Sequence, residues 1–165
     1  MAGGDVAVIV DIVHPAWRDL GRGLDASVSA AARAAIACSA QPVSNGAELG
    51  VRLTDDADIR DLNRAWRDRD AATNVLAFAL NDAPGSGAYA MLGDVVIALE
   101  TCRDEARDQD KTIMDHLTHL VVHGTLHLLG FDHQDEAEAD AMESLERTVL
   151  EGLGIADPYV DHRSA

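Results

Sequence analysis

The chain has 165 residues, of which 47% are hydrophobic and 4% aromatic, and its formal net charge is −16 at pH 7. This length suits a single domain, residues 1–165, with a core of mainly alanine and aliphatic side chains. The charge argues against a generic basic surface for nucleic acid, although it leaves room for a local positive cleft.

The sequence carries no recognisable targeting segment. Its N-terminus lacks the basic region and the long apolar stretch of a signal peptide. No window approaches a membrane span of about 20 apolar residues. Cys38 and Cys102 lie far apart in alanine-rich or charged contexts, which favours two free thiols over a disulfide or a metal site. We therefore expect a cytoplasmic protein without membrane contact.

The N-terminal half is predicted to alternate strands and helices. DVAVIVDIV, residues 5–13, is rich in β-branched residues, which favour a strand. Alanine content favours a helix at 25–40, with Asp25 or Ser27 as its N-cap. The other elements predicted here are a short helical stretch after Pro15 that packs Trp17 and Leu20, a loop at 41–46 and a strand at 47–53.

A further helix is predicted directly after that strand. Ile59, Leu62 and Trp66 recur at helical spacing and therefore share one face. Three consecutive residues could cap the helix: Thr54, Asp55 and Asp56.

The C-terminal half is predicted to hold two strands and three helices. Its elements are a polar connection at 67–73, a buried strand at 74–80, a Gly/Pro loop at 81–90, a strand at 92–99, helices at 100–110, 112–129 and 135–150, and a loose tail at 155–165. Gly130 is expected to end the second of these helices. The order mixes strands and helices around one small sheet.

Three histidines fall within HGTLHLLGFDH, residues 123–133. His123 and His127 are four residues apart, so a helix places both imidazoles on one face within reach of one ion. A chain reversal at Gly130 lets His133 supply a third nitrogen. Three neutral imidazoles leave a zinc ion with an open fourth position, as in catalytic sites, where a water can lose its proton and become a nucleophile.

Neighbouring residues leave several roles open. A histidine pair alone is commonly incidental on a polar helix face, and it is the third histidine that favours a metal site. His116 and His119 extend the same face, where we favour support of the site, substrate contact or packing over ligation. Asp132 either orients a ligand histidine or caps the turn. A zincin-type peptidase is not expected, because position 124 is glycine where that motif has its glutamate base.

Four segments together resemble the YbeY family of bacterial rRNA maturation factors. HGTLHLLGFDH is similar to the family pattern H-G-x-L-H-L-x-G-[YF]-D-H. The other segments are LNRAWRDRDAATNVLAF at 62–78, LGDVVIA at 92–98, and EAEADAMESLE with the later LGI, within 136–155. The resemblance covers most of the chain from about residue 48 onward, and the N-terminal segment matches only by general pattern.

The resemblance implies an α/β (α+β) fold: a single small, mostly parallel mixed sheet of about four strands flanked by helices, with a three-histidine metal site at the end of a central helix. Family members are described as single-strand-specific endoribonucleases that act in maturation of the 3′ end of 16S rRNA and in ribosome quality control. Carried over, His123, His127 and His133 bind one zinc ion or another divalent transition metal. These histidines would be catalytic together with Arg67, which matches an arginine near the family's metal cleft.

Two positions depart from the family pattern. Ala77 and Ala98 stand where the family usually has serine, so a hydrogen bond in the cleft could be lost. Thr73 and Asn74, at the start of the predicted buried strand, either orient the cleft or cap the turn.

Phosphodiester cleavage needs charge stabilisation on the phosphoryl oxygens, and Arg67 is expected to bind one of them bidentately. The nearest candidates for a positive RNA path are Arg60, Arg64 and Arg69. Binding to so acidic a chain should be weak and salt-sensitive, so a partner, the small ribosomal subunit or its proteins, is expected to supply specificity. Two alternatives stay open: a metal hydrolase on another phosphoester or a peptide, and a non-catalytic ribosome assembly factor with a structural metal. The expected state is a monomer.

Overall fold

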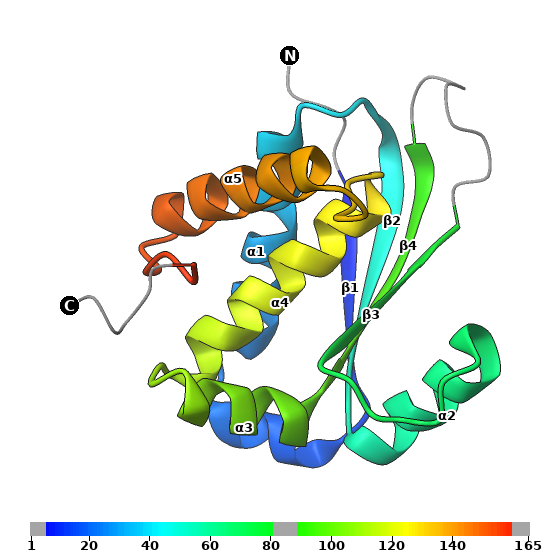
Figure 1. Cartoon of the computed structure of the whole chain (residues 1–165), viewed down its shortest axis with the longest axis vertical. Helices are drawn as coiled ribbons and strands as arrows, with labels where there is room; N and C mark the ends of the chain where they lie inside the picture. The colour runs from blue at the N-terminus through cyan, green and yellow to red at the C-terminus, as the bar shows by residue number, and fades with distance from the viewer. Residues whose placement is uncertain (1–5, 81–88, 160–165) are drawn as a thin grey trace.

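A four-stranded sheet with the order β1-β2-β4-β3 organises the molecule (Figure 1). The computed structural model describes residues 6–80 and 89–159. The strands are β1 (Ala7–Ile12), β2 (Val43–Thr54), β3 (Val75–Ala79) and β4 (Tyr89–Ala98). β1, β2 and β4 are parallel, and β3 is antiparallel to β4. The predicted small, mostly parallel mixed sheet is confirmed.

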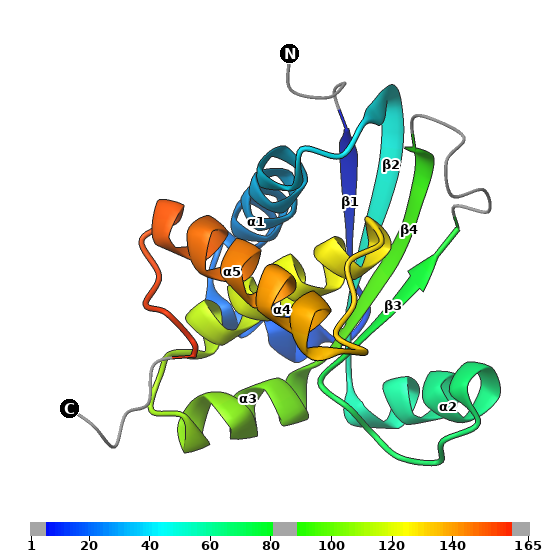
Figure 2. The same ribbon diagram turned by 45° about the horizontal axis from the view of Figure 1, so that its top comes forward.

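Most of the helices gather on one side of this sheet. They are the 3-10 helix η1 (Pro15–Leu20) and the α-helices α1 (Leu24–Ser39), α2 (Asp56–Arg67), α3 (Leu99–Asp108), α4 (Ile113–Leu128) and α5 (Glu136–Gly152). Figure 2 shows α1, α4 and α5 together on one side of the sheet. Helix α2 lies apart from them, near the lower ends of β3 and β4 in this view. The helical layer therefore covers one face of the sheet, and α2 covers only part of the other.

Alternation along the strands matches these unequal faces. Leu49, Val51 and Leu53 of β2 are fully buried in the main core, which α1 and α4 share. On the opposite face, Ile59 of α2 packs against Val96 in a small second cluster. Successive strand residues point to opposite faces, so each strand supplies both layers. Beyond α2, no other helix that the structure describes covers the second face.

Two strand predictions differ from the structure. β2 begins at Val43, inside the predicted loop at 41–46. Val43 pairs with Tyr89 of β4, and the register between β2 and β4 is irregular from Val43 to Leu49. β3 was expected to be buried, but it is half-buried because it forms a sheet edge. Apolar content predicts a strand without specifying its place in the sheet. Of the predicted loop at 81–90, residues 81–88 lie outside the described residues, and residues 89 and 90 belong to β4, which begins at Tyr89.

The cap predictions have mixed outcomes. Asp55, one of three candidates, caps α2 by accepting a hydrogen bond from the Asp58 amide at 2.9 Å. α1 instead begins after Gly23 without a side-chain cap, so the predicted caps Asp25 and Ser27 were wrong. The reason is that Leu24, only 3% exposed, already belongs to the helix and the core, which places Asp25 in the first turn.

The segment after α5 is not a loose tail where the structure describes it. The Ile155 amide donates to the Leu150 carbonyl at 2.8 Å, and the Tyr159 hydroxyl donates to Glu146. The prediction is therefore corrected for residues 155–159, and residues 160–165 lie outside the described part. Both cysteines are free thiols, as predicted. Within the described residues, no helix is long and apolar enough to cross a membrane.

Candidate metal centre

Helix α4 carries four histidines on one face. Thr112 caps the helix by accepting from the Asp115 amide at 3.1 Å, and the apolar residues of α4 pack into the core. The histidines recur every three or four residues, so they line up along the helix. They are His116, His119, His123 and His127.

Gly124 allows α4 to lie directly on the sheet. A Cβ at this position would come within 2.6 Å of Val95 Cγ1 on β4 and 3.1 Å of its Cγ2. Gly124 therefore faces the sheet, whereas the neighbouring His123 points into the cavity that it shares with His127 and His133. A glutamate base in the zincin position would have no room, which gives a structural reason for the absence of that motif.

The chain reverses after α4 and brings His133 back to the helix. Gly130 has a φ of 98°, a left-handed conformation that suits glycine, and its amide donates to the His127 carbonyl. Asp132 Oδ1 then accepts from the His133 amide at 2.8 Å. Of the two predicted roles for Asp132, the structure supports the turn cap.

The three motif histidines converge on one point. Ligand nitrogens of His123, His127 and His133 all lie within 4.8 Å of one another. His123 Nε2 and His127 Nε2 are 3.1 Å apart. Tetrahedral zinc with Zn–N bonds of about 2.0–2.1 Å separates its nitrogens by about 3.4 Å, so the arrangement is close to what such an ion requires. The three-histidine group could therefore hold a metal ion.

The electrostatics of His127 favour the neutral form that binds metals. Burial lowers the pKa of His127, and the neighbouring His123 and His133 lower it further. A histidine must be deprotonated at the ligating nitrogen to bind an ion. The lowered pKa therefore keeps His127 ready to bind at neutral pH.

A buried carboxylate, Glu146 of α5, orients the cluster from behind. Its side chain is fully buried and accepts hydrogen bonds from His123 Nδ1 at 2.5 Å, His119 Nε2 at 3.0 Å and the Tyr159 hydroxyl. Burial by itself raises the pKa of a carboxyl group, but the hydrogen bonds from His119 and His123 outweigh it and lower the pKa of Glu146 to about 2. When His123 donates through Nδ1, its Nε2 keeps a lone pair directed at the convergence point.

Sequence reasoning missed Glu146, although a signal was present. Met142, Glu146, Val149 and Leu150 all lie on the buried face of α5. A carboxylate at a core position of an amphipathic helix requires a partner, because burying an unpaired charge is costly. That pattern could have singled out Glu146 among the many acidic residues of the helix.

The two further histidines of α4 have supporting partners. His116 Nε2 lies 2.8 Å from Glu105 Oε1, and the Asn74 amide donates to the same carboxylate at 2.9 Å. His119 bonds Glu146 and meets the Tyr159 ring edge-on. Neither belongs to the trio of motif histidines, although ligand atoms of His119, His123 and Glu146 also lie within 4.8 Å of one another. Of the open roles for Asn74, its bond to Glu105 favours orientation of the cleft wall.

A cavity of about 580 Å³ opens in front of the three histidines. Arg67 and Ala77 line it opposite the cluster, with Asn74, Val75, Leu76, Gly124, Gly130, Phe131 and Asp132 around them. Arg67 donates from Nη2 to the Ala77 carbonyl at 2.7 Å, and its guanidinium lies 5.5 Å from the centre of the Phe78 ring. The structure thus brings Arg67 to the same cavity as the histidines.

The positions that depart from the family pattern have different surroundings. Ala77 lines the cavity, so a serine there would add a hydroxyl to the wall. Ala98 is fully buried in the second core cluster and does not line the cavity.

The other predicted arginines are less available for a positive path. Arg60 and Arg64 pair with acidic neighbours, Arg60 with Asp70 at 2.7 Å and Arg64 with Asp61 at 3.0 Å. Arg67 and Arg69 form no ion pair with any residue that the structure describes. Of these two, only Arg67 lines the cavity, so it supplies the uncompensated positive charge there among the described residues.

Comparisons with known proteins identify one family. A family described as "Endoribonuclease YbeY" matches residues 22–154. A protein of that name from Paramagnetospirillum magneticum is 51% identical over 159 residues, 93% of this chain and 96% of its own. Another from Azorhizobium caulinodans is 57% identical over 130 residues, 79% of this chain and 82% of its own.

Among solved structures, the solution structure of TM1509 from Thermotoga maritima has a similar fold. Its TM-score is 0.50 at 18% identity, with 95% of this chain and 100% of that chain covered. At that identity the likeness concerns the fold alone. The family match spans most of the chain and includes the histidine cluster, so the chain belongs to the endoribonuclease YbeY family.

Proposed function

We propose that this protein is a zinc-dependent endoribonuclease that cleaves single-stranded RNA, acting in 16S rRNA 3′-end maturation and ribosome quality control. Family membership supports the ribonuclease activity. The observation that carries the proposal is the convergence of three histidine nitrogens in a cavity that Arg67 also lines. The proposal includes a single domain over residues 1–165 and a cytoplasmic monomer. A non-catalytic role is not favoured, because the matched relatives are named endoribonucleases.

The metal ligands in this proposal are His123, His127 and His133, with zinc preferred and another divalent transition metal as the alternative. When bound, the ion supplies Lewis-acid polarisation of the phosphate and a nucleophile at neutral pH. Glu146 holds the ring of His123 so that Nε2 faces the cavity.

Arg67 is the group that binds the scissile phosphate opposite the histidines. The Ala77 carbonyl, which accepts a hydrogen bond from Arg67, carries no formal charge. The guanidinium therefore keeps its full positive charge for binding an anion. A planar guanidinium forms bidentate hydrogen bonds with phosphate and stabilises charge that develops on its oxygens. Arg69 is a further candidate for the RNA path, since it forms no ion pair with the residues that the structure describes. With so few free cations on the RNA path, a ribosomal partner would supply the specificity.

The test combines metal content with cleavage of single-stranded RNA. We expect about one zinc-like ion per chain, with both the ion and the cleavage lost in His127→Ala. Arg67→Lys should keep the metal and lower kcat/KM about 100-fold, as loss of one oxyanion donor does in other enzymes. His14→Ala, outside the cluster, is the matched control and should behave as wild type.

Two results would count against this function. Folded protein that binds no divalent metal would exclude the hydrolytic mechanism. Metal-loaded protein that cleaves a small phosphodiester or a peptide, but no single-stranded RNA, would replace the substrate and leave the metal site in place.

A further inference from the structure

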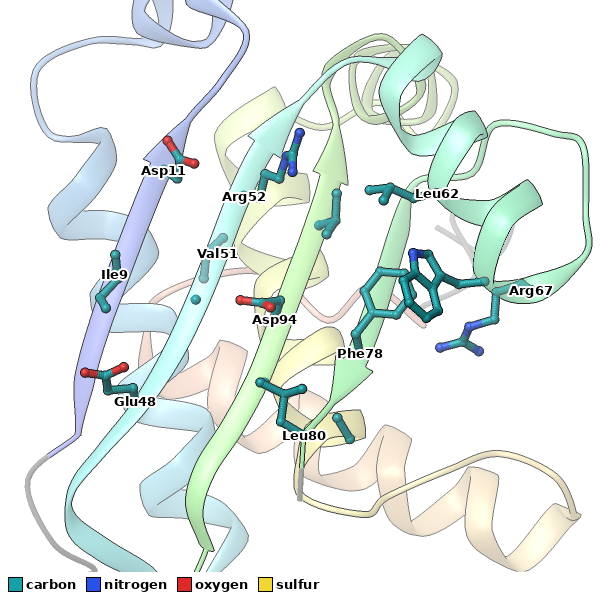
Figure 3. Close-up of a pocket in the computed structure, with 15 residues that line it drawn as sticks. Ile9, Asp11, Glu48, Val51, Arg52, Leu62, Arg67, Phe78, Leu80 and Asp94 are labelled. Atoms are coloured by element: carbon teal, nitrogen blue, oxygen red, sulfur yellow. The ribbon is translucent and has the colours of Figure 1, made fainter. Parts of the chain in front are cut away.

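A second groove, of about 760 Å³, lies on the open face of the sheet (Figure 3). Arg67 lines both this groove and the cavity of the three histidines, so the two spaces meet at that side chain. Leu62, Phe78 and Arg67 lie on one side of the groove in Figure 3, and Asp11 and Glu48 lie on the other. A strand bound at the metal centre can therefore continue past Arg67 into this groove.

The side of the groove near Arg67 is aromatic. Trp66 is 72% exposed, although it is among the largest apolar side chains of the protein. Phe78 lines the same groove, and the Arg67 guanidinium lies 5.5 Å from the centre of its ring. Arg67 forms no ion pair with the residues that the structure describes. Proteins hold single-stranded nucleic acid by combining an exposed aromatic ring, on which a base stacks, with a nearby arginine, and Trp66 and Arg67 provide both.

Charge restricts how a nucleotide can lie in the groove. The far side carries the carboxylates of Asp11 and Glu48, and Asp94 of β4 lies between the two sides as the register partner of Phe78. Arg52 also lines the groove but is already paired with Asp58 at 2.9 Å. Asp94 leans over Gly50, where a Cβ would come within 2.3 Å of its Oδ1. Phosphates are repelled by these carboxylates, so the backbone must follow Arg67, which lines both the groove and the histidine cavity, while an uncharged base enters the groove.

We propose that Trp66 and Phe78 form a stacking platform for one unpaired nucleobase of the RNA strand whose phosphate Arg67 binds. This inference rests on the proposed function and names a contact for its substrate. Stacking is available to every base, so the platform favours single strands over duplexes without selecting a sequence. Paired bases are already stacked in a duplex and cannot reach it.

A basic peptide is the competing occupant, because it would match the carboxylates. It would leave Arg67 without a partner and would not use the connection to the histidine cavity. The base is therefore the occupant that the geometry favours, and the peptide is an outcome of the test.

Tryptophan fluorescence can report the contact directly. The chain has two tryptophans, and Trp17 is fully buried with its indole N–H bonded to the Thr54 carbonyl at 2.8 Å. Quenching by a bound base therefore reports Trp66. The probes are a single-stranded 2′-O-methyl phosphorothioate nonamer, which resists hydrolysis, its duplex form, and a Lys-rich peptide. The nonamer should quench the emission of the metal-loaded protein, and the duplex and the peptide should not.

Variants separate stacking from a structural role. Trp66→Ala should weaken affinity for the labelled nonamer about tenfold, measured by anisotropy, and raise KM for cleavable RNA to the same extent. Its kcat and zinc content should stay unchanged, since the ring contacts neither the ligands nor the scissile bond. Trp66→Phe should keep affinity within about threefold, because it retains a stacking ring. Val13→Ala, an exposed apolar side chain outside the groove, is the matched control.

The outcomes distinguish this inference from the proposed function. Cleavage of single-stranded RNA with no quenching, or with full affinity in Trp66→Ala, overturns the platform and leaves the endoribonuclease in place. Quenching without cleavage supports the platform and overturns the function. Quenching by the peptide alone assigns the groove to a protein partner and overturns the platform.

Discussion

Glu146 decides the orientation of the candidate metal ligand His123. It is fully buried, and three donors from α4 and the C-terminal segment satisfy it. A carboxylate behind a ligand histidine fixes which ring nitrogen carries the proton and makes the other more basic. The same contact ties α5 to α4, so the site depends on a helix that contributes no ligand.

Exchange of Glu146 for glutamine should weaken zinc binding. We expect a 10–100-fold loss of affinity, about what the loss of such a partner costs in other metal sites. Competition with a chromophoric chelator measures the affinity, and circular dichroism checks that the fold is kept. Glu151→Gln, an exposed change on the same helix, is the control. Unchanged affinity in folded Glu146→Gln would show that His123 is oriented without this carboxylate.

At the scale of elements, the contact of α4 with the sheet sets the position of the histidines. Gly124 is the point of closest approach, against Val95 of β4 and Val75 of β3. Any side chain there pushes the helix and two of the candidate ligands away from the sheet. Because protein interiors are closely packed, even one added methyl is felt.

Gly124→Ala should therefore destabilise the protein. Overpacking costs about 1–3 kcal/mol, and the higher helix propensity of alanine offsets about 1 kcal/mol of that. Urea unfolding of metal-free protein should show a net loss of about 1 kcal/mol. The double variant Gly124→Ala/Val95→Ala should lose less than the sum of its single changes, since it removes the clashing methyl groups. Strict additivity would mean that this contact is not the cause.

The element predictions succeeded where local chemistry determines the structure. The cap at Asp55, the turn at Gly130 and the histidine face of α4 follow from short-range hydrogen bonding and helical spacing. The element predictions failed where pairing with distant segments of the chain determines the structure. The start of β2 at Val43 depends on pairing with β4, and the half-burial of β3 depends on its place at the edge.

At the scale of the whole molecule, burial couples stability to pH. His116 is only 2% exposed, and burial lowers its pKa, although the hydrogen bond that its ring donates to Glu105 opposes this shift. Lys111 lowers the pKa of His116 further, as does His119 to a smaller extent. In the unfolded chain the same imidazole titrates near 6.5. Below that pH the unfolded state binds more protons than the folded state, so acid favours unfolding.

The free energy of unfolding of EDTA-treated protein should therefore fall as the pH is lowered from 7.5 to 5.5. The contribution of His116 to the free energy of unfolding is fully present above the pKa that this histidine has in the unfolded chain. It is lost as the pH falls toward the lower pKa of His116 in the folded protein. Urea unfolding at several pH values measures it. His116→Gln should show a shallower dependence, and His14→Ala should keep the wild-type slope. A wild-type slope in His116→Gln would show that His116 is not the source.

The sequence by itself predicted the cluster of three histidines and the α/β class, because helical spacing, a helix-ending glycine and strand composition are local properties, whereas Arg67 was singled out only by the resemblance to the family. Only the tertiary structure decided that Glu146 stands behind His123, that the segment to Tyr159 packs on α5, and that Trp66 lies exposed over an open sheet face. Each of these depends on residues brought together from distant parts of the chain. Local patterns report which side chains share a face of an element, whereas packing decides what that face meets.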